Sequence, residues 1–371
     1  MKLTVTIIRI LTGALFIFSG LVKAIDPLGL AYKMQEFFEA WANAGIMKGL
    51  MSAFDKYAVS FSIIMITLEV AVGLALLLGW KKKLTTWILL LLMLFFTFLT
   101  SYVLFSGKIR ACGCFGDCIP LTPIQTFTKD IILLLFVIFL LINTKYITPV
   151  LKPLSNTLAV VLGIALTLYL QFHVLKHLPL KDCLPYKVGN NILELRKMPA
   201  DAVPDVFDYN FVYEKDGTKK NFTVASLPDS SWKFVERKQV LVSPGKNNIP
   251  LINDFSLTDE DGIKVTDSVL NTKGKYYLFF VKELTVDTAQ WRKKFFQLNE
   301  KAQQEGTKVY VITAQQQAVY DYLQDHKIFT NGVLSSDGIA IKTAARVNPT
   351  LFVMEGPVVK NKLSWRDMKN N

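Results

Sequence analysis

Long apolar segments alternate with short polar ones over the first half of the chain, and no apolar segment of that length occurs beyond residue 179. A helix needs about 20 predominantly apolar residues to cross a bilayer. The first segment lacks a small-residue cleavage site, so we interpret it as a retained anchor rather than a signal peptide. We therefore predict a polytopic bundle of five membrane helices, with these residues: 3–24, 58–79, 84–105, 127–143 and 154–175.

The second half of the chain has the pattern of an α/β domain, with short apolar strands between Gly, Asp and Asn turns. Between Cys183 and residue 250, polar and apolar residues alternate in short runs, which predicts a small β-rich connector. We expect four parts, with these bounds: a membrane domain at 1–150, a fifth transmembrane helix at 151–178, the connector at 179–250 and an α/β domain at 251–371.

Residues 31–57 are predicted to be helical but not to span the membrane. Phe37, Phe38 and Trp41 can share one face of this helix, while charged side chains remain solvated on the other. The segment is interpreted either as a lid over a site at the membrane surface or as a helix that rests on the rim of the bundle.

Basic residues next to the predicted spans indicate the orientation of the chain. Lys2, the run at 81–83, Lys145 and Lys152 fall on one side if there are five crossings. That side is predicted to be cytoplasmic by the positive-inside rule. The loop at 106–126 and everything after residue 177 then face outward, which gives a multi-pass protein of the cytoplasmic (inner) membrane with a periplasmic C-terminal domain.

The net charge of +12 lies mostly in the membrane half, where it is largely this topology signal. The sequence has no concentrated basic stripe of the kind that nucleic acid requires, so we exclude nucleic acid as a partner. We expect membrane lipid to surround the bundle. Phosphate-binding glycine loops, catalytic triads and paired hydrolase carboxylates are also missing from the sequence, which argues against ATPase and hydrolase functions.

Three of the four cysteines lie within seven residues, in the loop between the third and fourth predicted spans. These are Cys112, Cys114 and Cys118, and the fourth, Cys183, begins the second half of the chain. An outward-facing loop is in an oxidising compartment, where disulfides persist. The pairing stays open, because four cysteines allow three complete pairings. The cysteines are interpreted as two structural disulfides, as a redox relay that exchanges with partner thiols, or as a metal site, although their spacing is not typical of zinc sites.

Two motifs in the first two spans accompany this cysteine loop. Arg9, Gly13, Phe16, Ser19-Gly20, Lys23 and Asp26-Pro27 are followed by Glu69 and the run Gly73-Leu-Ala-Leu-Leu-Leu-Gly79. Together with Cys112-Gly-Cys114-Phe-Gly116, this order resembles the DoxX-like membrane family, in particular the branch of the methylamine-utilisation protein MauE, over residues 1–150. The resemblance implies a four-helix core and a role in disulfide formation or maturation of exported proteins, with a membrane quinone as electron acceptor.

Carried over residue by residue, the resemblance makes Cys112 and Cys114 the exchanging pair and Arg9 and Glu69 the intramembrane charges. A charge inside a membrane span is costly and normally has a partner. We expect Arg9 and Glu69 to meet as a structural ion pair, or alternatively to serve proton or quinone chemistry as cofactor-binding residues. Cys118 or Cys183 would act as shuttle or resolving thiol.

The C-terminal residues 250–371 resemble a thioredoxin-like domain of the peroxiredoxin/TlpA kind. The resemblance rests on residues 253–262, which match the opening hairpin of such domains, and on residues 347–353, which match the strand with the cis-proline. It implies a central strand at 276–281, a helix at 287–305, a further strand at 308–313 and a cis peptide bond at Pro349.

The active-site C-x-x-C of such domains is missing. At the corresponding place the chain reads Thr285-Val-Asp-Thr288, and a hydroxyl cannot replace a thiolate in disulfide exchange. The domain is therefore predicted to be redox-inactive by itself. It either binds a partner through Pro349 and Thr350 in the cis-proline groove or serves only as a scaffold.

His173 and His177 are four residues apart at the end of the fifth span and share a helix face. This is the spacing of a two-histidine metal site, but no third ligand is evident, and capping at the membrane interface is the favoured interpretation. The leading hypothesis is a membrane-bound thiol–disulfide exchange protein that acts on exported protein thiols. The alternative is a non-enzymatic adaptor with permanent disulfides, whose thioredoxin-like domain binds an envelope partner.

Overall fold

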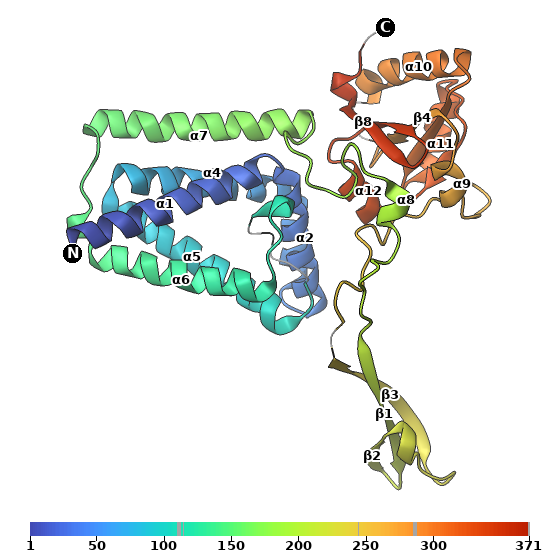
Figure 1. Ribbon diagram of the computed structural model, residues 1–371, viewed down its shortest axis with the longest axis horizontal. Coiled ribbons are helices and arrows are strands. Elements are labelled where there is room, and N and C mark those ends of the chain that lie inside the picture. The colour runs from blue at the N-terminus through green and yellow to red at the C-terminus, as the bar shows by residue number, and fades with distance from the viewer. Residues whose placement is uncertain (110–112, 114, 244, 285–287, 370–371) are drawn as a thin grey trace.

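A computed structural model describes residues 1–109, 113, 115–243, 245–284 and 288–369. Within these residues, five helices are long and apolar enough to cross a membrane, and they lie side by side as a bundle (Figure 1). The predicted membrane bundle is therefore confirmed. The helices are α1 (Lys2–Ala24), α4 (Ala58–Leu78), α5 (Lys82–Ser106), α6 (Pro123–Ile142) and α7 (Pro153–Lys176).

Close packing of α1 against α4 explains the glycines of the sequence motif. A Cβ atom at Gly73 would lie 2.9 Å from the carbonyl oxygen of Gly13, and a Cβ atom at Gly20 would lie 2.5 Å from the side chain of Val70. Small residues let two membrane helices approach in this way, so that packing can hold them together.

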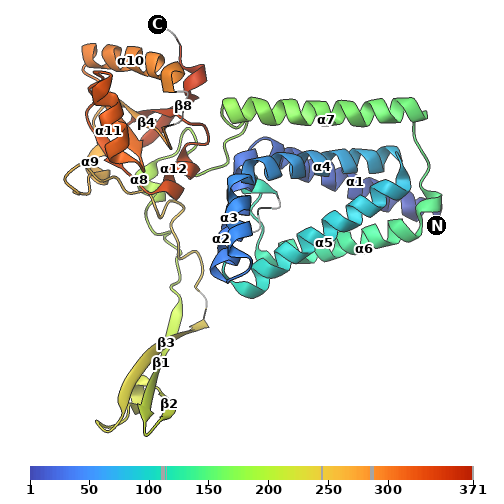
Figure 2. The ribbon, with the colours of Figure 1, turned by 180° about the vertical axis from the view of Figure 1, so that it is seen from behind.

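Two further helices cross one end of the bundle, and we call this the docked end. They are α2 (Pro27–Asn43) and α3 (Lys48–Lys56), and both Figure 1 and Figure 2 show α2 running across the direction of the spans. Phe37 on α2 is buried with Leu99 and Val103 of α5. The prediction of an amphipathic, non-spanning segment is confirmed, but the segment consists of two helices, because the chain turns at Gly45 with a φ of 80°.

The C-terminal half contains an α/β domain around a five-stranded sheet of order β6-β5-β4-β7-β8. β4 pairs in parallel with β5 and β5 with β6, whereas β7 and β8 are antiparallel. This mixed sheet is consistent with the predicted thioredoxin-like class, and the peptide bond between Asn348 and Pro349 is cis, as expected. The strands are β4 (Lys275–Phe280), β5 (Lys308–Thr313), β6 (Val333–Ser335), β7 (Thr350–Glu355) and β8 (Val358–Ser364).

Helices cover both faces of this sheet, so its central strand β4 is buried along almost all of its length. This explains why β4 reads as a continuous apolar and aromatic run rather than an alternating one. One face packs against α8 (Ile192–Leu195), α9 (Thr266–Leu270) and α12 (Gly338–Ala344). The other face packs against α10 (Thr288–Gln304) and α11 (Gln316–Asp325).

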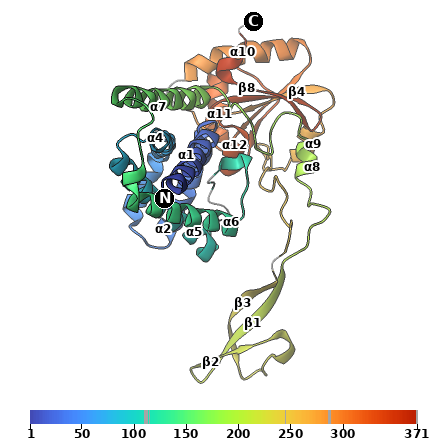
Figure 3. The ribbon, with the colours of Figure 1, turned by 60° about the vertical axis from the view of Figure 1, so that its left-hand side comes forward.

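The predicted β-rich segment forms an arm that projects away from both the bundle and the α/β domain (Figure 3). It is an antiparallel sheet of order β2-β1-β3, and every residue of β3 is exposed. Its strands are β1 (Val206–Lys215), β2 (Thr218–Phe222) and β3 (Lys233–Ser243).

The chain between α7 and the arm is attached along β8 of the α/β domain. The buried ammonium group of Lys362 lies 2.7 Å from the carboxylate of Asp182, and the Ser364 hydroxyl donates to the carbonyl oxygen of Lys176 at 2.9 Å. These contacts place Cys183 between the end of the bundle and the α/β domain.

Candidate functional site

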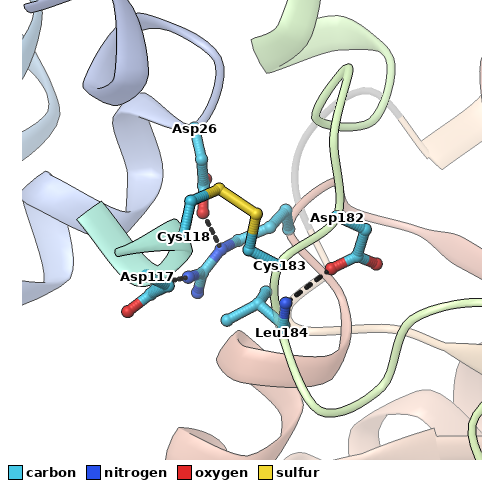
Figure 4. The surroundings of a disulfide bond; sticks show 7 residues. Asp26, Asp117, Cys118, Asp182, Cys183 and Leu184 are labelled. Atoms are coloured by element: carbon cyan, nitrogen blue, oxygen red, sulfur yellow. Dashed lines mark hydrogen bonds and ion pairs between the residues drawn. A yellow bond between two sulfur atoms is a disulfide. The ribbon is translucent and has the colours of Figure 1, made fainter. Parts of the chain in front are cut away.

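Cys118 and Cys183 form a disulfide bond at the docked end (Figure 4). Cys118 ends the 3-10 helix η1 (Gly116–Cys118), which is part of residues 112–118, here called the cysteine motif. The bond thus ties the motif to the segment that leads into the α/β domain, across a sequence separation of 65. Both sulfurs are bonded to one another, so neither is a free shuttle thiol in this form of the protein.

An arginine of the α/β domain reinforces this connection. Arg346 donates from Nε to the carboxylate of Asp26 and from Nη2 to that of Asp117, each at 2.9 Å. Its side chain is only 5% exposed. Burial would lower the pKa of Arg346, but the charges of Asp26 and Asp117 outweigh it and raise the pKa, so the guanidinium stays charged. The loop after α1, the cysteine motif and the α/β domain are therefore held by one cation.

A second contact joins the same two domains next to Arg346. Lys282, which follows β4, donates from Nζ to the carbonyl oxygen of Arg346 at 2.7 Å and to the hydroxyl of Tyr32 on α2 at 3.2 Å. Burial lowers the pKa of Lys282 to about 8, with further lowering from the neighbouring Arg346 charge. The end of β4 at which Lys282 lies therefore faces the membrane domain.

Arg9 does not pair with Glu69, so the predicted ion pair is wrong. Its guanidinium donates to the carbonyl oxygens of Leu76 at 2.8 Å and Thr148 at 2.9 Å, and also to that of Leu77. The last carbonyl groups of a helix have no partner within the helix and carry partial negative charge. Arg9 therefore caps the end of α4 at the far end of the bundle from the cysteine motif, and a cofactor-binding role does not fit this place.

Glu69 is paired with another residue of the same motif. Lys23 lies 2.7 Å from one carboxylate oxygen of Glu69, and Ser19 donates to the other at 2.7 Å. The side chains of Lys23 and Glu69 are each 4% exposed. An ion pair with an added hydroxyl donor is the arrangement that a charge inside a membrane bundle requires.

The Lys23–Glu69 pair lines a small inner cavity that also reaches the cysteine motif. The cavity has a volume of about 40 Å³, and its walls include Ser19, Lys129 and Gly113. Gly113 is the residue between Cys112 and Cys114 in the sequence, while both of these cysteines lie outside the described residues. The buried ion pair and the motif that carries the candidate thiols thus share one cavity.

Gly113 has a φ of 71°, and a Cβ atom there would lie 3.3 Å from Cγ of Lys33. A glycine is favoured at this position for two reasons, since other residues rarely adopt a positive φ and a side chain would press on Lys33. Lys33 forms an ion pair with Glu36 at 2.8 Å. The cysteine motif is consequently packed closely against α2.

An apolar cavity of about 320 Å³ adjoins the inner cavity at the level of the spans. Aromatic side chains make up much of its wall and contact one another, for example Phe38 with Phe54 and Phe54 with Phe61. The two cavities share wall residues from α2, α4 and α5: Met34, Phe37, Met65, Phe95 and Leu99.

An outer cleft of about 200 Å³ that contains charged side chains of both signs lies between α2 and α12. Lys33 lines both this outer cleft and the inner cavity, and Asp117 of the motif lines the outer cleft. The motif therefore lines a solvent-facing cleft through Asp117 and the inner cavity through Gly113.

The predicted partner-binding residues are placed inside the α/β domain. Pro349 and Thr350 are buried, and the Thr350 hydroxyl donates to the carbonyl oxygen of Val347 at 2.7 Å. Arg346, three residues before Pro349, is engaged by the membrane domain. In this form neither Pro349 nor Thr350 presents a surface to another protein.

The two histidines at the end of α7 stack with ring centroids 4.5 Å apart, and Nδ1 of His177 lies 2.6 Å from the carboxylate of Asp367. Over the described ranges, no group of three or more His, Cys, Asp or Glu side chains is arranged to hold a metal ion. The contact with Asp367 connects the membrane helix to the α/β domain.

Sequence reasoning missed three charged residues of this region. Lys23 was present in the motif but was not recognised as the partner of Glu69, although it lies one turn beyond Ser19. Asp130 on α6 is 1% exposed and lies 2.6 Å from Lys129. Two neighbouring residues of opposite charge inside an apolar segment could have indicated it from the sequence. Arg346 gave no sequence signal, because its partner Asp26 lies 320 residues away.

Comparison with known proteins finds family matches for two parts of the chain. Residues 1–143 match the protein family described as methylamine utilisation protein MauE, and residues 207–244, which include most of the arm, match a domain of unknown function (DUF8463). The chain is 33% identical over 174 residues to Protein TlpB of Flavobacterium psychrophilum. No solved structure matches significantly.

The alignment with Protein TlpB covers 45% of this chain and 43% of that protein, so the chain matches less than half of its relative's length. The family match falls on the part of the chain that holds α1, α4, α5 and α6, together with the cysteine motif. The chain is therefore a multi-pass membrane protein, with an N-terminal part similar to the methylamine utilisation protein MauE and a C-terminal α/β domain.

Proposed function

We propose that the protein carries out thiol–disulfide exchange at the membrane surface, with Cys112 and Cys114 as the exchanging pair. The observation that carries the proposal is the place of Gly113, the residue between them. It lines the cavity of the Lys23–Glu69 pair and packs against Lys33, which also lines the outer cleft. The similarity to the MauE family covers this motif, and the more specific DoxX-like relationship remains a prediction.

The disulfide between Cys118 and Cys183 supports this assignment of roles. The chain has four cysteines, so this bond leaves Cys112 and Cys114 as the remaining two. Their sequence neighbours Asp117 and Cys118 are fixed by Arg346 and by the disulfide. One pair of cysteines then anchors the motif, and the other pair exchanges.

The exchange starts from a disulfide between Cys112 and Cys114. A client thiolate attacks one of these two sulfurs, so that their mutual bond breaks, a mixed disulfide forms and the other sulfur leaves as thiolate. A second thiolate of the same client then attacks the client sulfur of the mixed disulfide, and the sulfur of Cys112 or Cys114 leaves as thiolate. The client leaves with a disulfide, and Cys112 and Cys114 hold the two electrons. Cationic groups nearby favour the thiolate forms, and Lys33 and Lys129 line the surrounding walls.

A membrane quinone is the acceptor that these surroundings fit, and when bound it supplies the capacity to take up two electrons and two protons. The inner cavity offers an ammonium group and a carboxylate from Lys23 and Glu69 at its polar end. The adjoining apolar cavity offers aromatic and thioether side chains, which suit an isoprenoid tail. The inner cavity is too small for a quinone ring, so the apolar cavity would hold the quinone among Phe37, Met65 and Phe95, and Lys23 and Glu69 would lie at the adjoining polar end.

The side of the membrane is part of the proposal. The docked end faces the periplasm, and the basic residues 81–83, Lys145 and Lys152 lie at the opposite, cytoplasmic end, in keeping with the positive-inside rule. The clients are then thiols of exported proteins. An oxidising compartment also suits the Cys118–Cys183 bond.

The adaptor alternative is favoured by a different observation. The arm presents exposed apolar side chains on a strand with one unpaired edge, for example Val240, Leu241 and Val242 of β3. Such an edge can accept a strand from another protein. In this alternative the arm or the α/β domain recruits an envelope protein, and the cysteines have no exchange role.

Replacement of single cysteines tests the proposal against the alternative. Cys114→Ser leaves Cys112 as a lone thiolate, which runs the exchange in reverse: it attacks a disulfide of an exported protein, one client sulfur leaves as thiolate, and a mixed disulfide forms. Without Cys114 no internal thiol resolves this bond, so mixed disulfides accumulate and appear on non-reducing gels. Cys112→Ser gives the reciprocal pattern. The adaptor alternative gains support if neither variant forms a mixed disulfide that a reductant cleaves.

A further inference from the structure

The outer cleft is built from both domains of the protein. Glu36 and Glu39 on α2 form one wall, and Lys342 and Thr343 on α12 form the other. The Arg346 clamp with Asp26 and Asp117 fixes the distance between these walls. The cleft therefore exists only while the α/β domain is docked on the membrane domain.

This cleft reaches the cysteine motif. Asp117 and Lys33 both line it, and Lys33 is also the side chain against which Gly113 packs. A molecule that enters the cleft from solvent thus meets the cysteine motif at Asp117.

The chemistry of the walls fits an extended polypeptide. They carry carboxylates from Glu36 and Glu39, an ammonium group from Lys342 and, at the rim, the side chain of Ile339, which is 68% exposed. Charges of both signs next to an apolar side chain suit a peptide backbone with mixed side chains better than a ligand of a single charge. No single-sign field is present that would select an anion or a cation.

We propose that this cleft binds an unfolded, thiol-containing segment of the client and guides its cysteine to Cys112 and Cys114. The inference rests on the proposed function. It gives the redox-inactive α/β domain a positive role, because α12 forms one wall of the client site. The cis-proline groove has no part in it, since Pro349 and Thr350 are buried.

The test compares two reductants of the Cys112–Cys114 pair in the full-length protein. One is a short, unfolded peptide with a single cysteine, which requires the cleft. The other is dithiothreitol, which is small enough to reach the motif without filling the cleft. Thiol labelling at residues 112 and 114, read by mass spectrometry, gives the two rates and their ratio.

Thr343→Trp and Ile339→Trp each place a bulky ring in the cleft. We expect the ratio of the peptide rate to the dithiothreitol rate to fall at least about tenfold in both variants. The matched control is Gln304→Trp on α10, which is exposed and lies over the opposite face of the sheet. The control should keep the wild-type ratio.

Two results would overturn the inference, and they differ in what they say of the proposed function. An unchanged ratio in both cleft variants, with the peptide still reducing the pair, removes the cleft from client binding and leaves exchange intact. Failure of both peptide and dithiothreitol to reduce residues 112 and 114 in the wild-type protein removes the proposed exchange as well.

Discussion

Two buried charge clusters lie close to the cysteine motif, one within the membrane bundle and one between the two domains. In the bundle cluster, Lys23 pairs with Glu69, and both side chains are 4% exposed. In the interdomain cluster, Arg346 is 5% exposed, but its partner Asp117 is 40% exposed. The first pair is withdrawn from water on both sides, whereas the second still meets solvent through one carboxylate.

This difference indicates that the two clusters have different roles. A charge inside the bundle must be neutralised wherever it lies, because the alternative is an unpaired charge at the level of the spans. The interdomain cluster holds a position instead, since Arg346 and the Cys118–Cys183 bond connect the cysteine motif to the α/β domain. Loss of the first should therefore affect stability most, and loss of the second should affect docking.

The largest effect is expected from Glu69→Gln, because it leaves the Lys23 ammonium group buried without a counter-charge. Breaking a buried ion pair on one side costs about 3–5 kcal/mol. Chemical unfolding in detergent should show a loss of free energy of that order. The double variant Lys23→Met with Glu69→Leu should recover most of it, since no charge is then left unpaired. Equal stability of Glu69→Gln and the exposed control Glu300→Gln would contradict the pairing.

Removal of the disulfide is expected to come next. The bond closes a loop across a sequence separation of 65, and such crosslinks typically stabilise a protein by about 2–4 kcal/mol. The double variant Cys118→Ser with Cys183→Ser should lose that much free energy of unfolding under non-reducing conditions. The wild-type protein should lose a similar amount on full reduction, and no further loss should occur when the double variant is reduced. Stability that is insensitive to this replacement would show that the bond does not hold the domains.

A smaller effect is expected from Arg346→Gln, which breaks both interdomain ion pairs. Asp117 can be hydrated after the change, so we expect a loss of about 1–3 kcal/mol, confined to docking. Hydrogen exchange should become faster in α2, α12 and the 116–118 turn, while the centre of the sheet stays protected. Arg237→Gln is the control, because Arg237 is exposed and lies on β3 of the arm. Faster exchange throughout the α/β domain would assign Arg346 to folding of that domain rather than to docking.

The smallest effect is a dependence of docking on pH. Lys282 has a pKa lowered to about 8 in the docked state, against an ordinary value of 10.5. Between these pH values the undocked state binds more protons, so docking becomes stronger as the pH rises. From pH 8 to pH 9 the gain stays below about 1.4 kcal/mol. The protection factors of the α2 amides, which correct for the faster intrinsic exchange at higher pH, should rise over this range, and Lys282→Met should remove the change. Docking that weakens above pH 8 would contradict the sign.

The regular elements could be predicted from the sequence because their signals are local. Length and apolarity identify the spans, and the strand pattern identifies β1, β4 and β5. The departure from an uninterrupted helix at residues 31–57 was not predicted, because a glycine within an amphipathic pattern does not by itself end a helix.

The candidate site was less predictable because its contacts join distant parts of the chain. A partner for Glu69 could be predicted, because a charge inside a membrane span is costly when unpaired. Whether Arg9 or Lys23 is that partner depends on how the helices pack. Arg9 extends to backbone carbonyl groups at the end of α4 instead. The pairing of Cys118 with Cys183 was one of several options, and the Arg346 clamp required the docked arrangement of both domains.

The most direct test of the central claim is a redox titration of Cys112 and Cys114 in intact membranes, with and without added quinone. Thiol trapping followed by mass spectrometry separates this pair from Cys118 and Cys183. The account predicts that Cys112 and Cys114 cycle at a moderate potential and are reoxidised by quinone, while Cys118 and Cys183 stay bonded to potentials below about −300 mV. If all four cysteines stay oxidised until strong reductant is added, and quinone changes nothing, the exchange function is contradicted and the adaptor alternative remains.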